Sequence, residues 1–522
     1  MKKLLAVLLA ASMTATLAAC GGGSGTTGET KPQGGTESGT TEAGTPVHDG
    51  SKIFKSVETF PYSSLDVHKE YYSWHTQFYG ISETLFRIDD EMQIQPWLAE
   101  SIETEENVST ITLKDGVCFS NGDALTADMV KRNLERIAEV NSRFAFVNDW
   151  QIEAKDDKTL VITTANVYPT LENDLATAEF GIMDLDATED FDKNPICTGP
   201  FVVDNFVPEG DISVKYNENY WDGDVQLDGA TFYYMGDEES KLLAMQNGEI
   251  DGYVDISAAS REIYEMDPDL YTVTTVPTQR RAYALLNANK LSDNVRAAIV
   301  LALDKDTLAA YMNGLIAPAE GVFSPDTYYG GVQAPKTDVA KAKELLEADG
   351  YKLNANGIYE KDGKPLTIVL SCYAKRSIDT MAILMQEQLK AIGIDAQIGL
   401  EEDPDGTYMS TKDFQIGFYV SITDKAGEPF TFLNMIETGK YMDVCGFGNE
   451  ETDALIEELR YETDETKQKE LADQIMTNFY ASNDYLMIGQ YNKSSVLRAG
   501  ATGLGETSPL QFYGIDANTN ID

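Results

Sequence analysis

One stretch in the second half of the chain constrains the fold more than any other: two short apolar runs separated by an amphipathic segment. PLTIVLS (365–371) and IDAQIGL (394–400) have the length and composition of β-strands, and residues 377–391 between them have helical spacing. One side of that helix carries the apolar residues Ile378, Met381, Met385 and Leu389. A strand, helix and strand with short connections form a parallel pair with a right-handed crossover. The sequence therefore predicts an α/β fold for at least this region.

Further elements follow from capping and turn residues. Thr126 precedes ADMVKRNLERI, whose apolar residues Val130, Leu134 and Ile137 lie on one face, so a capped helix is predicted there. Before it, residues 110–114 alternate as a strand does, and Asp115 and Gly116 turn the chain. Other helices are predicted at residues 295–303, 339–349, 452–461 and 467–480.

The first twenty residues form an export signal. Two lysines precede an apolar run of eight residues, Leu4 to Ala11, and small residues then lead to Cys20. The run is far shorter than the roughly 20 residues that a membrane-spanning helix needs, and no later segment approaches that length. The ending Leu17-Ala18-Ala19-Cys20 resembles the bacterial lipobox, which implies cleavage and lipidation at Cys20. An ordinary secretory signal with a chance cysteine is the alternative.

Residues 21–50 are predicted to be a flexible tether. They contain 10 Gly, 7 Thr and 2 Ser and no aromatic residue, and His48 belongs to them. Thirty residues of this composition span on the order of 30 Å, which is enough slack for a folded body to move above a membrane.

Charge and cysteine content exclude several classes. The 86 acidic and 40 basic residues give a net charge of −46, which disfavours binding to nucleic acid or through a polybasic membrane patch. The 42% of hydrophobic residues and the length predict two or three domains. The four cysteines of the body are too scattered for a disulfide scaffold, so we expect buried, small apolar side chains and leave their disulfide state open. These cysteines are Cys118, Cys197, Cys372 and Cys445.

The sequence offers little for catalysis. It contains no Walker A, HExxH, GxSxG or GxGxxG motif, and its only histidines are His48, His68 and His75. We therefore expect no enzyme, no catalytic residue and no cofactor. An anchored extracellular hydrolase that uses carboxylates stays open as an alternative, because 86 acidic residues produce many chance pairs.

The segment that begins at Pro96, PWLAESIETEENVSTITLKDGVCFSNGDALTADMVKRNLERI, resembles the family 5 solute-binding proteins of ABC importers, which capture peptides or nickel complexes. The resemblance continues in order through GPFVVDNF, YNENYWDG, KLLAMQNGEIDGY, VRAAIVLALDKDTLAAYMNG and DVAKAKELLEADGY. It implies a two-lobe fold like that of periplasmic binding proteins. The implied boundaries are a first lobe at 51–285 with an extra subdomain at about 85–190, a second lobe at 286–488, and a return to the first lobe at 489–522.

The same resemblance implies partners and a location. The expected ligand is a short peptide, with a nickel or other metal chelate as the rival and an opine as a further possibility within the family. The expected partners are the permease and ATPase subunits of an importer. The protein is expected to be a monomer, held by its N-terminal lipid on the extracytoplasmic face of the cell membrane, or in the periplasm of a Gram-negative cell.

Site residues are transferred from the family one by one. Trp74 and His75 lie in a segment, 65–86, that resembles the first ligand-facing region, although an aromatic cluster is equally typical of a core. Arg143 falls where nickel-binding relatives hold the carboxylates of a chelator, and its guanidinium suits a carboxylate; a surface ion pair is the alternative.

Glu428 lies where peptide binders place an acid for the ligand's ammonium group, and a solvated loop acid is the alternative. Tyr283, with Arg280 and Arg281, lies near the expected hinge, where ordinary strand residues are the favoured interpretation. The metal-coordinating histidine of the nickel binders falls near Tyr441, and no histidine follows His75, so the sequence predicts no imidazole ligand from the second lobe and no metal site.

Overall fold

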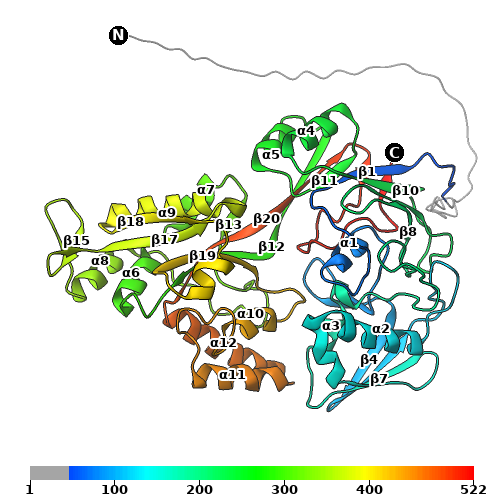
Figure 1. Ribbon diagram of the computed structural model, residues 1–522, viewed down its shortest axis with the longest axis horizontal. Coiled ribbons are helices and arrows are strands. Elements are labelled where there is room, and N and C mark those ends of the chain that lie inside the picture. The colour runs from blue at the N-terminus through cyan, green and yellow to red at the C-terminus, as the bar shows by residue number, and fades with distance from the viewer. Residues whose placement is uncertain (1–45) are drawn as a thin grey trace, which may run out of the picture. The chain divides into compact units, whose positions relative to one another are not determined.

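The long strands β12 (Tyr271–Leu286) and β20 (Tyr485–Arg498) connect the two halves of the body. The computed structural model describes residues 46–522. In Figure 1, β12 and β20 run side by side from the part that contains β1 and α4 into the part that contains β17 and α9. They are antiparallel, and their register shifts between Pro277 and Arg281. The pairing is therefore interrupted where the strands pass between the two parts.

These strands belong to a seven-stranded sheet. Its order is β11-β20-β12-β19-β17-β18, and β13 pairs with β20 outside this path. The remaining strands are β11 (Gly252–Val254), β13 (Ile316–Pro318), β17 (Thr367–Tyr373), β18 (Asp395–Glu401) and β19 (Ile416–Ile422).

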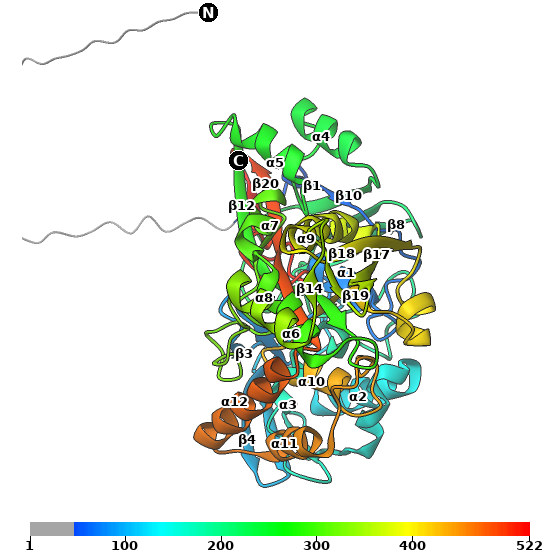
Figure 2. The same cartoon turned by 90° about the vertical axis from the view of Figure 1, so that its left-hand side faces the viewer.

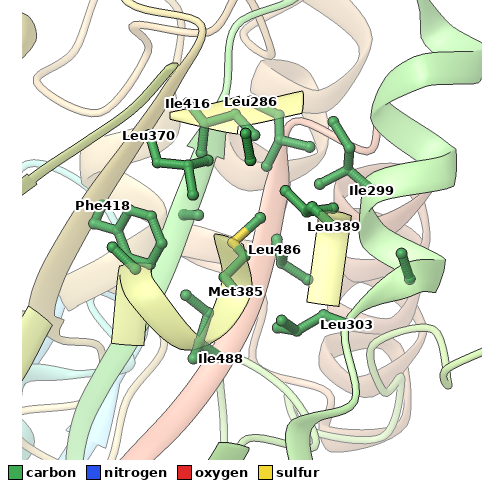
Figure 3. Packing of buried hydrophobic residues seen from close by; sticks show 14 of the residues in the cluster. Leu286, Ile299, Leu303, Leu370, Met385, Leu389, Ile416, Phe418, Leu486 and Ile488 are labelled. Carbon is green, nitrogen blue, oxygen red and sulfur yellow. The ribbon is translucent and has the colours of Figure 1, made fainter. Parts of the chain in front are cut away.

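The predicted strand, helix and strand are confirmed. Strands β17 and β18 are parallel, from the pair Thr367 and Asp395 to the pair Tyr373 and Glu401, and α9 (Ile378–Ile392) joins them. The predicted apolar face of α9 is fully buried. Figure 3 shows Met385 and Leu389 of α9 packed among side chains of β17, β19, β12 and β20. The helix therefore forms because one face covers the sheet.

Helices cover this sheet and extend one end of it. We call the part formed by β13–β19 and α6–α12 the second lobe. In Figure 2, α6, α8 and α9 face the viewer, and α11 and α12 lie below them. The helices of this lobe are α6 (Asp293–Ala302), α7 (Lys305–Tyr311), α8 (Val339–Ala348), α10 (Phe430–Ile436), α11 (Glu450–Tyr461) and α12 (Glu465–Ala481). Four of these confirm helices predicted from the sequence.

The other part, which we call the first lobe, contains two four-stranded sheets. One has the order β1-β10-β9-β8, with β1 (Ile53–Glu58) parallel to β10 (Gly229–Tyr234) and with β9 (Ile212–Tyr216) and β8 (Phe201–Phe206) antiparallel. The other is antiparallel, in the order β4-β5-β7-β6. Its strands are β4 (Ala99–Glu105), β5 (Val108–Leu113), β6 (Gln151–Ala154) and β7 (Thr159–Thr163).

Helix α2 (Ala127–Val140) contacts the second of these sheets and begins as predicted. The Thr126 side chain accepts a hydrogen bond from the Met129 amide at 3.2 Å, which satisfies one unpaired donor of the first turn. In the tail after β20, Leu504 and Ile515 are buried in the same cluster as Phe54 and Phe201 of the first lobe.

Short elements complete the chain. The helices are α1 (Tyr72–Phe78), α3 (Leu171–Leu175), α4 (Glu238–Asn247) and α5 (Ala258–Glu265), the 3₁₀ helices η1 (Ser142–Asp149), η2 (Ala178–Phe180) and η3 (Lys375–Ser377), and the π-helix η4 (Asp405–Met409). The strands are β2 (Phe86–Ile88), β3 (Ile94–Pro96), β14 (Lys352–Leu353), β15 (Tyr359–Lys361), β16 (Lys364–Pro365), β21 (Ala501–Thr502) and β22 (Asn520–Ile521). Within residues 46–522, every helix is too short or too polar to span a lipid bilayer.

Two details differ from the sequence-based expectation. His48 was assigned to the flexible tether, but it packs on the folded body. Its Nδ1 lies 3.0 Å from Asp228 Oδ1, and its ring stacks on Tyr216 at 3.8 Å. Cys118 is only partly buried: it lies in an isolated β-bridge with Ala124, and its thiol donates to the Asn219 carbonyl. The other three body cysteines are buried as expected, and all four are free thiols.

Candidate ligand-binding site

The two lobes meet at a buried carboxylate, Glu179 of η2, which has no exposed surface. Lys425, in the loop between β19 and α10, extends from the second lobe and places its Nζ 2.7 Å from Glu179 Oε1. Arg143 of η1 places Nη2 3.7 Å from the same oxygen. Within residues 46–522, Glu179 Oε2 has no hydrogen-bond partner. One carboxylate from the first lobe is thus shared by two cations, one from each lobe.

The loop that carries Lys425, residues 423–429, is held against the first lobe by backbone contacts as well. Asn173 Nδ2 donates to the Ala426 carbonyl at 2.7 Å. Gly427 has φ +73°, and a Cβ atom there would lie 2.7 Å from the Met92 carbonyl oxygen. Only glycine allows this approach without strain. We call residues 423–429 the contact loop.

Trp74 lies beside this ion pair. The centroid of its ring is 5.9 Å from Lys425 Nζ, which is within the range of a cation–π interaction. It is 6.1 Å from the ring of Phe512 in the tail. The indole Nε1 is buried and has no hydrogen-bond partner in the part of the chain that the structure describes. Arg280 of β12 donates from Nη2 to Gln511 Oε1 at 3.0 Å at the edge of the same crevice.

The crevice between these side chains is narrow. Its volume is about 20 Å³, which has room for about one water molecule. It is lined by both lobes and by the tail: Trp74, Thr278, Gln279, Arg280, Ile422, Lys425, Pro509, Leu510, Gln511 and Phe512. A solute larger than water can therefore enter the space between Trp74 and Lys425 only when the lobes separate.

A second and larger cavity, of about 500 Å³, lies further along the same interface. It is lined from the first lobe by aromatic side chains such as Trp150 and Tyr168, and from the second lobe by Glu428 and Arg460. The volume falls within the range of small-molecule sites. The Arg460 guanidinium lies 5.0 Å from the Phe430 ring centroid, so this cavity combines aromatic, acidic and basic groups.

Two carboxyl groups of this cavity have raised pKa values. Burial raises the pKa of Glu428 to about 7, and the nearby charges of Asp424 and Asp174 act in the same direction. Burial also raises the pKa of Asp174 to about 6. Glu428 caps the start of α10, since its carboxylate accepts from the Thr431 amide at 3.1 Å and from the Phe430 amide. A cationic group that entered the cavity would keep both carboxyl groups ionised.

Trp74 and Glu428 thus each line one of the two interface cavities, and Arg143 lies beside Glu179 at the same interface. His75 lines neither cavity. The His75 ring stacks on Tyr62 at 4.1 Å, and its Nδ1 lies 3.2 Å from Glu58 Oε2. Burial opposes ionisation of Glu58, but hydrogen bonding and charge from His75, with a hydrogen bond from Tyr79, hold the pKa of that carboxyl below its usual value.

Tyr283 lies in the core of the second lobe with no exposed surface, and its hydroxyl is 3.0 Å from Ser421 Oγ. Arg281 is also buried and donates to the Thr278 and Gly321 carbonyls. Burial lowers the pKa of Arg281 to about 10. Cys20 lies outside the described residues. Tyr441 donates a hydrogen bond to Asp405 on the second lobe.

The sequence-based list omitted the groups that join the lobes. Lys425 lies in the segment already singled out for Glu428, and a lone cation in that loop of a strongly acidic chain was the available signal. Glu179 gave no signal, because it is one of 86 acidic residues and its importance depends on burial. Among residues 46–522 no cluster of three or more side chains has the composition and spacing of a metal site.

Two lobes with separate cores, joined by a pair of long strands and meeting at a cavity, define a binding protein that closes around a solute. The model of the bacterial extracellular solute-binding proteins, family 5, matches residues 93–443, and the chain belongs to this family. It is a solute-binding protein of the ABC importer class.

Known relatives are similar over most of their length. The nickel-binding protein NikA of Staphylococcus aureus is 26% identical over 455 residues, which cover 85% of this chain and 89% of the relative. The glutathione-binding protein GsiB of Escherichia coli is 27% identical over 329 residues, 60% of this chain and 62% of the relative. The crystal structure of a nickel ABC transporter protein from Bacillus halodurans, 26% identical, superposes with a TM-score of 0.79 over 90% of this chain and all of that chain.

Proposed function

We propose that this protein captures short peptides between its lobes and delivers them to the permease of an ABC importer, without catalysing their breakdown. The observation that carries the proposal is the junction of Lys425, Arg143 and Glu179 beside Trp74. When the lobes part, the Lys425–Glu179 pair breaks. Lys425 then remains on the second lobe, and Glu179 and Arg143 remain on the first. A peptide with a terminal carboxylate and a terminal ammonium replaces both halves of that pair.

Each candidate residue has a role in this proposal. Arg143 and Lys425 bind the peptide's carboxylate, Glu428 binds its ammonium group, and Trp74 packs on its backbone or side chains. His75 and Tyr283 support the site from within the lobes, since neither lines an interface cavity. Carboxylate and ammonium are common to all peptides, so such a site selects for length more than for side-chain identity.

The second candidate ligand is a nickel chelate, which the names of the relatives from Staphylococcus aureus and Bacillus halodurans favour. A chelated metal carries carboxylates that Arg143 and Lys425 suit. Direct ligation by the protein is disfavoured, because residues 46–522 contain no cluster of metal-ligating side chains at the interface.

The remaining expectations complete the proposal. We propose that lipid on Cys20 holds a monomer on the extracytoplasmic face, near its permease and ATPase subunits. We also propose lobe boundaries at residues 51–285 with 489–522, and at 286–488. The separate sheet β4-β5-β7-β6 supports a subdomain at about 85–190.

Native mass spectrometry of the protein purified without refolding tests the proposal. Binding proteins retain ligand from the cell when dissociation is slow. A set of added masses that correspond to short peptides would support capture of peptides and give their length directly. A single added mass with the isotope pattern of nickel would favour the chelate instead. Failure to bind either class, with no heat on titration of dipeptides to tetrapeptides or of nickel with free histidine, would contradict the proposal.

A further inference from the structure

The wider of the two cavities between the lobes is larger than a peptide's ammonium group requires. Its volume is about 500 Å³, against about 20 Å³ for the crevice beside Trp74. The contact loop reaches both spaces, because Lys425 lines the crevice and Glu428 lines the cavity. A peptide whose carboxylate binds Lys425 and whose ammonium group binds Glu428 therefore places its first residue in the cavity.

The charges that line this cavity are unbalanced. Its carboxyl groups belong to Asp149, Asp174 and Glu428. Its one basic residue, Arg460, is already paired, since Nη2 lies 3.4 Å from Glu437 Oε1 and Nε lies 3.2 Å from Glu457 Oε2, and neither of these glutamates lines the cavity. Among the ion pairs of residues 46–522 none involves the three lining carboxyl groups. The cavity thus attracts a further cation.

Asp174, in the first-lobe wall, has a carboxylate oxygen that the protein leaves unused. Its Oδ2 accepts a hydrogen bond from the Tyr168 hydroxyl, whereas its Oδ1 is accessible to solvent and accepts no hydrogen bond from the described part of the chain. Glu428, in the second-lobe wall, differs: it is 9% exposed, and both of its oxygens accept hydrogen bonds from Phe430 or Thr431 at the start of α10. One ammonium group at Glu428 therefore leaves Asp174 Oδ1 free for a second cation.

The wall beside Asp174 suits the hydrocarbon part of a long basic side chain. The ring centroid of Trp150 lies 6.0 Å from that of Tyr168 and 5.7 Å from that of Phe146, and all three residues line the cavity. The methylene groups of lysine and arginine pack on such apolar surface while the charged end stays at a polar group, and a cation near an aromatic face gains further attraction. A neutral aliphatic side chain would fill the same space and leave Asp174 unpaired.

We propose that this cavity holds the side chain of a lysine or arginine at the first position of the peptide, with Asp174 Oδ1 as its ionic partner. The inference rests on the function proposed above and adds a side-chain preference to a site that otherwise selects for length. The terminal ammonium group binds Glu428 on the second lobe, and the basic side chain binds Asp174 on the first. A peptide that begins with a basic residue thus connects the two lobes through both of its cations.

Titration calorimetry of the full chain with four tripeptides at pH 7.5 in 0.15 M salt tests this. Asp174 is ionised at this pH, because burial raises its pKa only to about 6. Lys-Ala-Ala should bind at least about tenfold more tightly than norleucine-Ala-Ala, which has a side chain of similar length without the charge. Ala-Ala-Lys, which carries the same charge at the other end, should show no such gain over Ala-Ala-norleucine.

Two variants assign the gain to its residue. Asp174→Asn removes the charge and keeps an oxygen that accepts from Tyr168, so Lys-Ala-Ala should lose its advantage over norleucine-Ala-Ala. Glu172→Gln on the same helix is the matched control, because Glu172 lines neither interface cavity, and it should retain the full advantage.

The comparison of tripeptides on the unmodified protein is decisive without any variant. Equal affinities for Lys-Ala-Ala and norleucine-Ala-Ala would overturn the inference and leave the capture of peptides standing. An equal gain for Ala-Ala-Lys, or a gain that persists in Asp174→Asn, would also overturn it, since either would show only general attraction of a cation to an acidic protein. If none of the four tripeptides binds, the proposed function itself is contradicted, and the inference falls with it.

Discussion

Among single residues, Lys425 bears most directly on solute capture, because it is the cation of the second lobe that crosses to Glu179. Its counterpart Arg143 reaches the same oxygen at 3.7 Å. The two cations lie 282 positions apart in the numbering of the sequence and meet only through the fold. The arginine was a candidate through the family resemblance of its segment, whereas the lysine's role depends on the closed arrangement of the lobes.

Lys425→Met should weaken binding of a short peptide by about 1.5–3 kcal/mol if the lysine binds the terminal carboxylate. The same substitution should weaken binding of a peptide with an amidated C-terminus much less, since that peptide has no negative charge at its C-terminus. Lys440→Met is the matched control, because Lys440 is exposed and makes no ion pair within residues 46–522. Titration calorimetry of the two variants with the two peptides measures the coupling. Equal losses for acid and amide peptides would remove Lys425 from the site.

Glu83 is a buried carboxyl of the first lobe, and its ionisation links stability to pH. Burial raises its pKa in the folded protein to about 7, against hydrogen bonds from Trp221 and Tyr220 that lower it. The folded state then binds more protons than the unfolded state between about pH 4.5 and 7, so stability falls as pH rises through this window. The loss at pH 8 amounts to about 3 kcal/mol from one group.

Glu83→Gln removes this charge. Its amide oxygen can still accept from Trp221, and its amide NH₂ can donate to the Tyr220 oxygen in place of the hydrogen bond that Tyr220 donates to Glu83. Urea unfolding should therefore show the variant gaining stability over the wild type as pH rises from 4.5 to 8. A difference between the two proteins that stays constant over this range would show that Glu83 ionises normally in the folded state.

At the scale of elements, the sequence predicted those parts whose signals are local. Helix α9 and its two strands follow from apolar spacing over 36 residues, and α2 follows from its cap at Thr126. The contact loop was recognised only through Glu428, and its docking could not be predicted. Docking depends on Asn173 and Met92, more than 250 positions away, and on the left-handed conformation of Gly427. Local patterns carry no information about such contacts.

Gly427→Ala tests whether the contact loop controls closure. Gly427 and Gly363 have similar φ angles, +73° and +70°, so alanine costs about 1 kcal/mol of backbone strain at either position. At Gly427 the new Cβ would also lie 2.7 Å from the Met92 carbonyl oxygen of the other lobe, whereas at Gly363 it would meet nothing within 4 Å. Both variants should lose similar stability in urea, and only Gly427→Ala should bind peptide more weakly. Weakened binding in both would assign the effect to general destabilisation.

At the scale of the whole molecule, closure of the lobes requires a hinge and contacts that stabilise the closed state. Strands β12 and β20 pass between the lobes (Figure 1). The register shift between Pro277 and Arg281 interrupts their pairing beside the interface crevice, which Thr278, Gln279 and Arg280 line, and this is the expected hinge. The contact is the Lys425–Glu179 pair together with the Asn173–Ala426 hydrogen bond. Each lobe has its own core, and of the second lobe only Ala426 of the contact loop is buried in the first-lobe cluster, so the lobes can separate without unfolding either one.

Small-angle scattering measures this motion directly. Without ligand, Lys425→Met should have a larger radius of gyration than the wild type, because it loses the ion pair that holds the lobes together, while Lys440→Met should match the wild type. Saturating peptide should bring all three to the same smaller radius, since ligand contacts replace the lost pair and shift the population to the closed state. Identical radii for the wild type and Lys425→Met without ligand would show that the pair does not hold the lobes. A radius unchanged by ligand in every variant would mean that the solute binds without closure, and the interface would then not be its site.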